Sequence, residues 1–111
     1  MTDRELLELA AKAAGYEMLP AGASKPRIAL LPDDPVYAPW SPLSSDGDAL
    51  RLAMKLGIQI IPGENYIEAV KPSPRLRQTR FCEMYSAHDN PLAATRYAVV
   101  RAAAEIGRPV L

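Results

Sequence analysis

Proline is concentrated in one part of this chain and limits where regular structure can form. Six of the eleven prolines lie between Pro20 and Pro42. Each proline fixes φ and removes a backbone donor, so helices and sheet ladders are interrupted repeatedly there. We predict an irregular segment over residues 20–46, in which only Ile28–Leu31 has the apolar run of a short strand. The single tryptophan, Trp40, is expected to be buried and to serve as a structural anchor for this segment.

Three helices are predicted outside the proline-rich segment, over residues 3–14, 47–56 and 91–106. Each predicted start follows a side chain that can accept a hydrogen bond from a free N–H of the first turn. These capping residues are Thr2, Ser45 or Asp46, and Asn90. Glycine is expected at the helix ends, because it readily adopts the left-handed conformation found there; the three are Gly15, Gly57 and Gly107.

Apolar spacing predicts which sides of the helices are buried. Helix 47–56 is apolar around most of its circumference, so we expect it to be largely buried; the residues are Leu50, Leu52, Ala53, Met54 and Leu56. Helix 91–106 has an expected core stripe of Leu92, Val99, Ala103 and Ile106. Its polar side chains are expected to face water; they are Arg96, Arg101 and Glu105.

Short apolar runs separated by turn residues predict strands at 58–61, 66–70 and 80–85, with a further short one at 16–19. A Pro-Gly turn at 62–63 favours antiparallel pairing of the first two. We therefore predict an α+β fold, in which a small antiparallel sheet of three to four strands is layered with three helices as an α-β-α sandwich. The length favours a single domain over residues 1–111.

Composition narrows the classes of function. Thirteen basic and thirteen acidic residues give a formal net charge of +0, which argues against a protein that coats DNA and favours self-association. The one cysteine, Cys82, excludes an internal disulfide and suggests a reducing compartment. Acidic residues near the amino terminus do not match a signal peptide, and no apolar stretch is long enough for a membrane span. We expect no membrane interaction.

Several short motifs resemble those of a family of small tailed-phage and prophage proteins, often described as the phage "ABA sandwich" domain. They are Trp40-Ser41-Pro42-Leu43, the run Asp46-Gly47-Asp48-Ala49-Leu50-Arg51-Leu52-Ala53, Asp89-Asn90-Pro91, and Ala94-Thr95-Arg96 through Ala102-Ala103. In the family an asparagine often follows the tryptophan, where this chain has Ser41. The resemblance implies an α-β-α layered fold and a phage or prophage origin. It implies no activity and carries over no catalytic residue.

Catalytic and metal sites are not indicated by the sequence. Cys82, His88 and Asp89 could in principle form a nucleophile, a base and an orienting acid, but a mid-strand cysteine beside Glu83 is more typical of a small buried side chain. Helix capping accounts for Asp46 and Asp48 without a metal ion. Asp33 and Asp34 are the other acidic candidates for a metal, and Asp46-Gly47-Asp48 lacks the rest of a metal-binding loop. We expect no catalytic residue, no metal and no cofactor.

A basic segment over residues 71–80 is the strongest local candidate for binding. It carries Lys71, Arg75, Arg77 and Arg80, followed by the aromatic residues Phe81 and Tyr85. Arginine binds phosphate well and aromatic rings stack on bases, so these four cations are candidate nucleic-acid contacts. The alternative is a solvated loop whose charges pair with nearby acids.

These observations favour a non-enzymatic phage or prophage accessory protein that binds a host or phage protein in the host cytoplasm. A weak nucleic-acid-binding module using residues 71–80 is the alternative, and a small hydrolase or transferase comes third. A homodimer is also predicted. Small residues on helix 91–106 would let a second copy approach closely; they are Ala93, Ala94, Ala98, Ala102 and Ala104. The same alanines could instead favour helix formation and pack inside the monomer.

Overall fold

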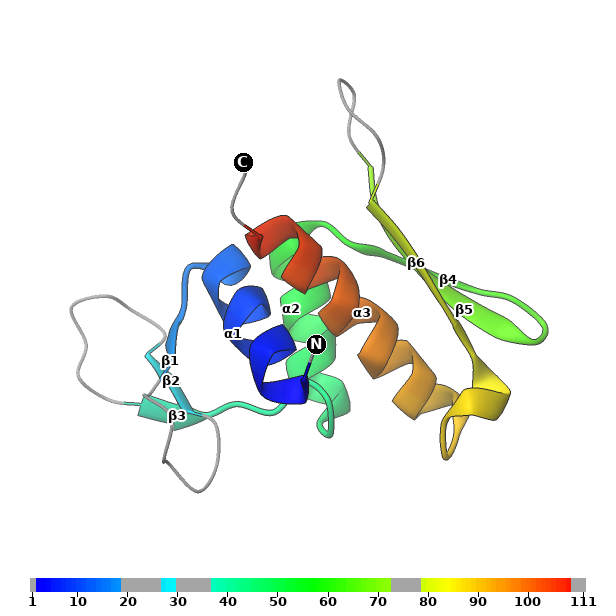
Figure 1. Cartoon of the computed structure of the whole chain (residues 1–111), viewed down its shortest axis with the longest axis horizontal. Helices are drawn as coiled ribbons and strands as arrows, with labels where there is room; N and C mark the ends of the chain where they lie inside the picture. Colours follow the sequence, from blue (N-terminus) through cyan, green and yellow to red (C-terminus); the bar gives the residue numbers. More distant parts are fainter. Residues whose placement is uncertain (1, 19–26, 30–36, 73–78, 109–111) are drawn as a thin grey trace.

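The structure, a computed structural model, describes residues 2–18, 27–29, 37–72 and 79–108 (Figure 1). These residues contain three α-helices: α1 (Asp3–Ala14), α2 (Asp46–Leu56) and α3 (Pro91–Gly107). The strands are β1 (Glu17–Met18), β2 (Arg27–Ala29), β3 (Tyr37–Pro39), β4 (Gln59–Pro62), β5 (Tyr66–Lys71) and β6 (Thr79–Met84). A 3₁₀ turn, Tyr85–Ala87, follows β6.

The helices begin where their capping residues predict. Thr2 accepts a hydrogen bond from the N–H of Glu5, Ser45 from that of Asp48, and Asn90 from that of Ala93. Two of the three expected glycine ends are confirmed, since Gly15 and Gly57 adopt the left-handed conformation with φ of 76° and 69°.

Gly107 has a different role from the one predicted. It is the last residue of α3, it is buried, and it does not adopt the left-handed conformation. A Cβ atom at this position would meet the carbonyl oxygen of Leu9 in α1. Glycine is therefore needed here because two helix backbones approach closely, and not because the helix ends.

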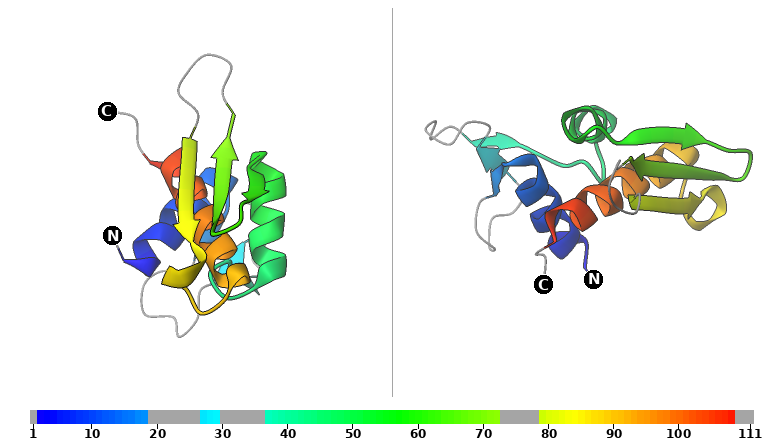
Figure 2. Two further views of the ribbon diagram at one scale, coloured as in Figure 1. Left: turned by 90° about the vertical axis from the view of Figure 1, so that its right-hand side faces the viewer. Right: turned by 90° about the horizontal axis from the view of Figure 1, so that it is seen from above.

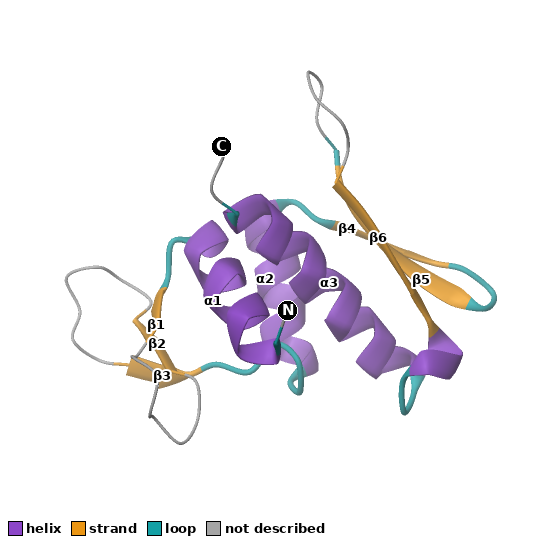
Figure 3. Cartoon of the chain, in the orientation of Figure 1, coloured by secondary structure: helices purple, strands orange, loops and turns teal. Residues whose placement is uncertain are grey.

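Two antiparallel sheets are present among the described residues. The larger has the strand order β4-β5-β6, with Ile60 opposite Ala69 and Ala69 opposite Phe81. The smaller has the order β1-β2-β3 and lies beside α1 (Figure 3). The predicted irregular segment 20–46 thus contains β2 and also β3, a strand that was not predicted. Residues 19–26 and 30–36 of that segment lie outside the description.

The predicted fold class is confirmed: the chain has an α+β fold with three helices and a three-stranded antiparallel sheet in its described part. In the described part of the chain the β4–β6 sheet packs on α3 through one face, and α1 and α2 pack against α3 from its other sides (Figure 2). The middle layer is α3, because its small side chains let three neighbours approach it.

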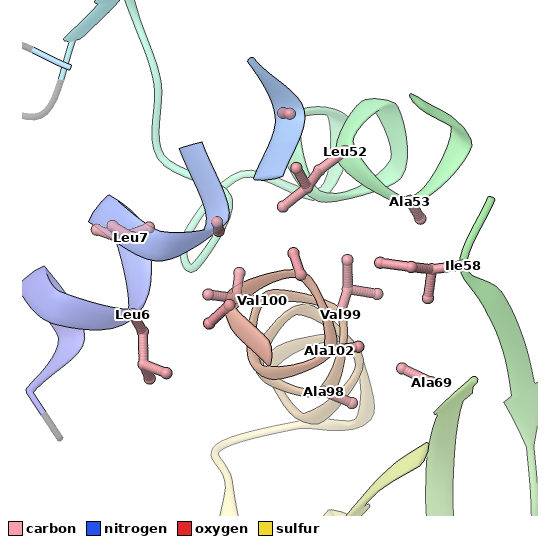
Figure 4. Packing of buried hydrophobic residues seen from close by; sticks show 14 of the residues in the cluster. Leu6, Leu7, Leu52, Ala53, Ile58, Ala69, Ala98, Val99, Val100 and Ala102 are labelled. Carbon is pink, nitrogen blue, oxygen red and sulfur yellow. The ribbon is translucent and has the colours of Figure 1, made fainter. Parts of the chain in front are cut away.

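The core surrounds α3. Figure 4 views this helix nearly end-on, with Leu6 and Leu7 of α1 on one side, Leu52 of α2 above, and Ile58 and Ala69 toward the sheet. Val99 and Val100 of α3 are fully buried at its centre.

Trp40 belongs to this core and is only 4% exposed. Its ring meets that of Tyr16, which follows α1, edge-on at a centroid distance of 6.0 Å. The predicted burial of Trp40 is confirmed. Its role as an anchor of the proline-rich segment remains a prediction.

Candidate functional site

The basic segment is described at its two ends, and both cations there are engaged within the chain. Lys71 donates a hydrogen bond from Nζ to the carbonyl oxygen of Leu56 (2.6 Å), at the end of α2. Arg80 pairs with Glu68 on the neighbouring strand, with 2.8 Å between Nη1 and Oε2. Arg75 and Arg77 lie outside the described residues. These contacts make Lys71 and Arg80 parts of the fold and weaken the case for a nucleic-acid interface.

The structure places Cys82 away from the carboxylate that His88 contacts. Cys82 is exposed, which corrects the expectation of a buried cysteine; it lies on the open face of the sheet, opposite Glu68. The imidazole Nε2 of His88 instead contacts Oε1 of Glu83 at 2.8 Å. Alternate residues of a strand point to opposite faces, so Cys82 and Glu83 lie on different sides of the sheet.

Glu83 is the centre of a half-buried polar cluster that the sequence did not predict. Its second carboxylate oxygen accepts a hydrogen bond from Arg101 of α3, which was expected to face water. Arg101 also lies over the ring of Phe81, 4.7 Å from its centroid, and His88 packs against Tyr97 at 5.3 Å. The cluster fastens β6 and the following turn to α3. We assign the cluster a structural role, because its contacts join β6 to α3.

The aspartates at the start of α2 are held by cations and backbone, as capping predicts. Asp46 pairs with Arg96 of α3 at 2.5 Å, and Arg96 Nε donates to the carbonyl oxygen of Leu43. Arg96 was expected to face water, but it ties α3 to the entry of α2. Asp48 accepts from the N–H of Ser41 (2.9 Å) and pairs with Arg51. Within the described ranges, no cluster of three metal-ligating side chains occurs.

Two predictions about burial in α2 and α3 are wrong. Leu50 and Met54 are 56% and 77% exposed, so α2 is not largely buried. Leu92 is 57% exposed and is not part of the core stripe of α3. The reason is that α2 packs on its neighbours through one side only, which carries Ala49, Leu52 and Ala53.

Two of these exposed side chains, Leu50 and Leu92, line an apolar groove. The groove lies between α2, α3 and the start of the sheet, and its lining residues are Asp46, Ala49, Leu50, Ile60, Leu92, Thr95, Arg96 and Val99. Figure 2 shows α2 standing beside the sheet and α3. We call the groove, together with Met54 one turn along α2 from Leu50, the α2–α3 surface. The sequence pattern did not distinguish Leu50, Met54 and Leu92 from core residues, because all three have helical spacing.

Most of the alanines of α3 are not accessible for the dimer contact predicted from them. Four of them are buried in the monomer core: Ala94, Ala98, Ala102 and Ala104. A second copy that docks there would have to displace α1 or the sheet.

A search of the described residues finds no helix with the length and apolar character needed to cross a bilayer. No family model matches the chain, and no curated protein matches it.

Proposed function

We propose that this chain is a non-enzymatic accessory protein that acts by binding another protein through the α2–α3 surface. The observation that carries the proposal is the exposure of Leu50, Met54 and Leu92. Among the large apolar side chains of the described residues, these three are the most exposed. Leu50 and Leu92 line one groove, and Met54 follows Leu50 one turn along α2. Contiguous apolar surface of this kind marks interaction sites on small proteins.

The charges of the groove also support protein binding. Its only charged lining residues are Asp46 and Arg96, which pair with each other at 2.5 Å. An apolar partner can therefore cover the groove without leaving a single buried charge unpaired, which would be costly. Binding energy in such interfaces comes mainly from a few apolar anchors that are fully desolvated at the centre.

The biological setting is proposed from the sequence alone. The motifs around Trp40, at the start of α2 and at the start of α3 resemble those of small phage and prophage proteins. We therefore propose that the partner is a host or phage protein in the host cytoplasm.

A capture experiment tests the proposal. The immobilised chain is incubated with bacterial lysate, with and without nuclease treatment, beside a variant carrying Leu50→Glu and Leu92→Glu. A matched control carries Gln59→Glu and Ser86→Glu, which adds the same charges at other exposed positions. We expect a protein that the wild type and the control retain and the variant loses. Equal retention by all three would overturn the proposal, and capture that nuclease abolishes would favour the nucleic-acid alternative.

A further inference from the structure

We propose that the outer edge of β6 is a second binding site, which takes an extended peptide segment of another protein as an added antiparallel strand. The site is separate from the α2–α3 surface and goes beyond the proposed function. A strand added in this way is held by backbone hydrogen bonds, and pockets for its alternate side chains select its sequence. β6 offers backbone groups that point outward, and a hollow adjoins it.

The register of the sheet shows which backbone groups of β6 point outward. In the described part of the chain β6 is the last strand of the order β4-β5-β6, and it pairs only with β5. The N–H of Tyr85 donates to the carbonyl oxygen of Asn65 at 3.1 Å, and bonded residues alternate along an antiparallel ladder. The N–H and C=O groups of Cys82 and Met84 therefore point away from β5. Both residues are exposed, so an incoming strand can reach these groups.

Other strand edges among the described residues are protected in ways that the edge of β6 is not. Gly63 N–H donates to the carbonyl oxygen of Tyr66, so the same alternation turns the backbone of Pro62 to the outer side of β4. Proline has no N–H to offer there, which is a common protection of edge strands. The strands of the smaller sheet have only two or three residues each. On β6, Arg80 pairs with Glu68 of β5 at 2.8 Å, which draws its charge over the sheet and away from the edge.

A hollow adjoins the edge of β6 on the side of the helices. It lies between α1, β6 and α3, and its lining residues are Leu6, Phe81, Arg101, Ala104, Glu105 and Arg108. Figure 2 shows β6 at the edge of the sheet, with α3 behind it. Residues directly opposite each other in a sheet share one face. In an added strand, the side chain opposite Phe81 therefore points into the hollow, and its neighbours point to the open face of the sheet.

The hollow is suited to an uncharged apolar side chain. Its charged lining residues are already paired, Arg101 with Glu83 and Arg108 with Glu105. The remaining lining residues are apolar. A charged side chain would lose its hydration there without gaining an unpaired partner among the lining residues, whereas an apolar one gains by leaving water. The expected ligand is thus an extended segment with an apolar side chain at alternate positions.

A second copy of β6 does not meet this requirement. Edge-to-edge pairing would turn its own Phe81 and Glu83 toward the hollow. In its own chain Glu83 is held by Arg101 and His88, and the Phe81 ring lies under Arg101 at 4.7 Å. Neither side chain can enter the hollow without leaving these contacts. We therefore assign the edge to a segment of a different protein.

Hydrogen exchange measured by NMR tests whether the edge is open. In the free chain, the amides of Cys82 and Met84 should exchange at least about 100-fold faster than those of Phe81 and Glu83, which bond to β5. Equal protection of all four amides overturns the proposal, because the edge would then already be covered.

Two forms of one blocked peptide, Thr-Val-Thr-Val-Thr, test binding and the role of the hollow. N-methylation of the valines leaves only the edge whose pairing turns valine side chains into the hollow, and N-methylation of the threonines leaves only the other. We expect the N-methylvaline form to bind with a Kd of about 1 mM and to protect the amides of Cys82 and Met84. The N-methylthreonine form, which brings the isosteric threonine to the hollow, should bind at least about fivefold more weakly.

A proline variant tests the backbone pairing. Cys82→Pro removes one outward N–H at an edge position that tolerates proline, and the control Cys82→Val keeps it. Cys82→Pro should bind the N-methylvaline peptide at least about fivefold more weakly than the control, the expected effect of one hydrogen bond. Equal binding by the two variants, equal binding of the two peptides, or no binding at about 10 mM overturns the proposal. The Leu50→Glu and Leu92→Glu variant should bind as the wild type does. Loss of binding in that variant would place the peptide on the α2–α3 surface, which overturns this inference and supports the proposed function.

Discussion

The two carboxyl-terminal helices of the core, α2 and α3, differ in how many of their sides are covered. Among the described residues, α3 is packed by the β4–β6 sheet, α1 and α2, whereas α2 packs through one side and exposes Leu50 and Met54. Apolar content alone does not explain the difference, because both helices are rich in apolar residues. The size of the side chains does, since α3 carries alanine and glycine where its neighbours approach most closely.

Small side chains allow α3 to sit in the middle of the fold. Ala98 and Ala102 are buried, and α1 approaches so closely at Gly107 that no Cβ atom fits. Leucine and methionine at equivalent places on α2 would hold a neighbour farther away, and no neighbour covers them within the described residues. A buried helix is thus identified by where its small residues lie as much as by its apolar stripe.

The largest expected effect is at Trp40, which belongs to the core that α3 centres. Trp40→Ala removes a ring that is 4% exposed and that meets Tyr16 edge-on. We expect a loss of about 3–5 kcal/mol in the free energy of unfolding, measured by denaturant titration. An unchanged free energy, or indole fluorescence typical of full exposure, would contradict the anchor and favour an interface role for this residue.

A smaller change in stability is expected at Gly107, and its sign distinguishes helix propensity from close packing as the dominant effect. Alanine favours a helix over glycine by about 1 kcal/mol, so propensity alone predicts that Gly107→Ala stabilises the chain. The close approach of Leu9 predicts the opposite, because the two backbones must separate. We expect a net loss of about 1–3 kcal/mol, as in other overpacked cores. A gain in thermal stability would show that α1 and α3 are not in close contact.

Much of the fold follows from local signals in the sequence. Capping residues, helix-ending glycines and apolar runs locate all three helices and the strands of the larger sheet to within about two residues. These signals act over a few residues and do not depend on what packs against them. The strand β3 was missed, because it ends at Pro39 and the prolines around it dominate the local pattern, which predicts irregular structure.

The candidate site was predicted much less well, for a physical reason. An exposed leucine and a buried leucine have the same place in a helical pattern, so Leu50, Met54 and Leu92 were assigned to the core. The half-buried arginines were also predicted wrongly, because they were expected to face water. Arg96 and Arg101 each find a carboxylate from a distant element, which only the tertiary arrangement brings near.

A modest effect is expected at Lys71, which joins the end of β5 to the end of α2. Lys71→Met keeps most of the side-chain stem and removes the charge that contacts the carbonyl oxygen of Leu56. Loss of a cation at a helix carboxyl terminus should lower the free energy of unfolding by about 0.3–1 kcal/mol. Gln59→Met, at an exposed position of β4, is the control and should leave stability unchanged. Stability equal to the wild type in both variants would leave Lys71 available for a ligand.

The most direct test of the difference between α2 and α3 places charge on each helix. At about 1 μM, where we expect the chain to be monomeric, the free energy of unfolding is measured for a Leu50→Glu and Met54→Glu double variant and for Ala98→Glu. The double variant should lie within about 0.5 kcal/mol of the wild type, because its side chains point to solvent. Ala98→Glu should lose more than about 3 kcal/mol or fail to fold, since Ala98 is fully buried. A loss of more than about 2 kcal/mol in the double variant would contradict the account, because Leu50 and Met54 would then be covered within the monomer.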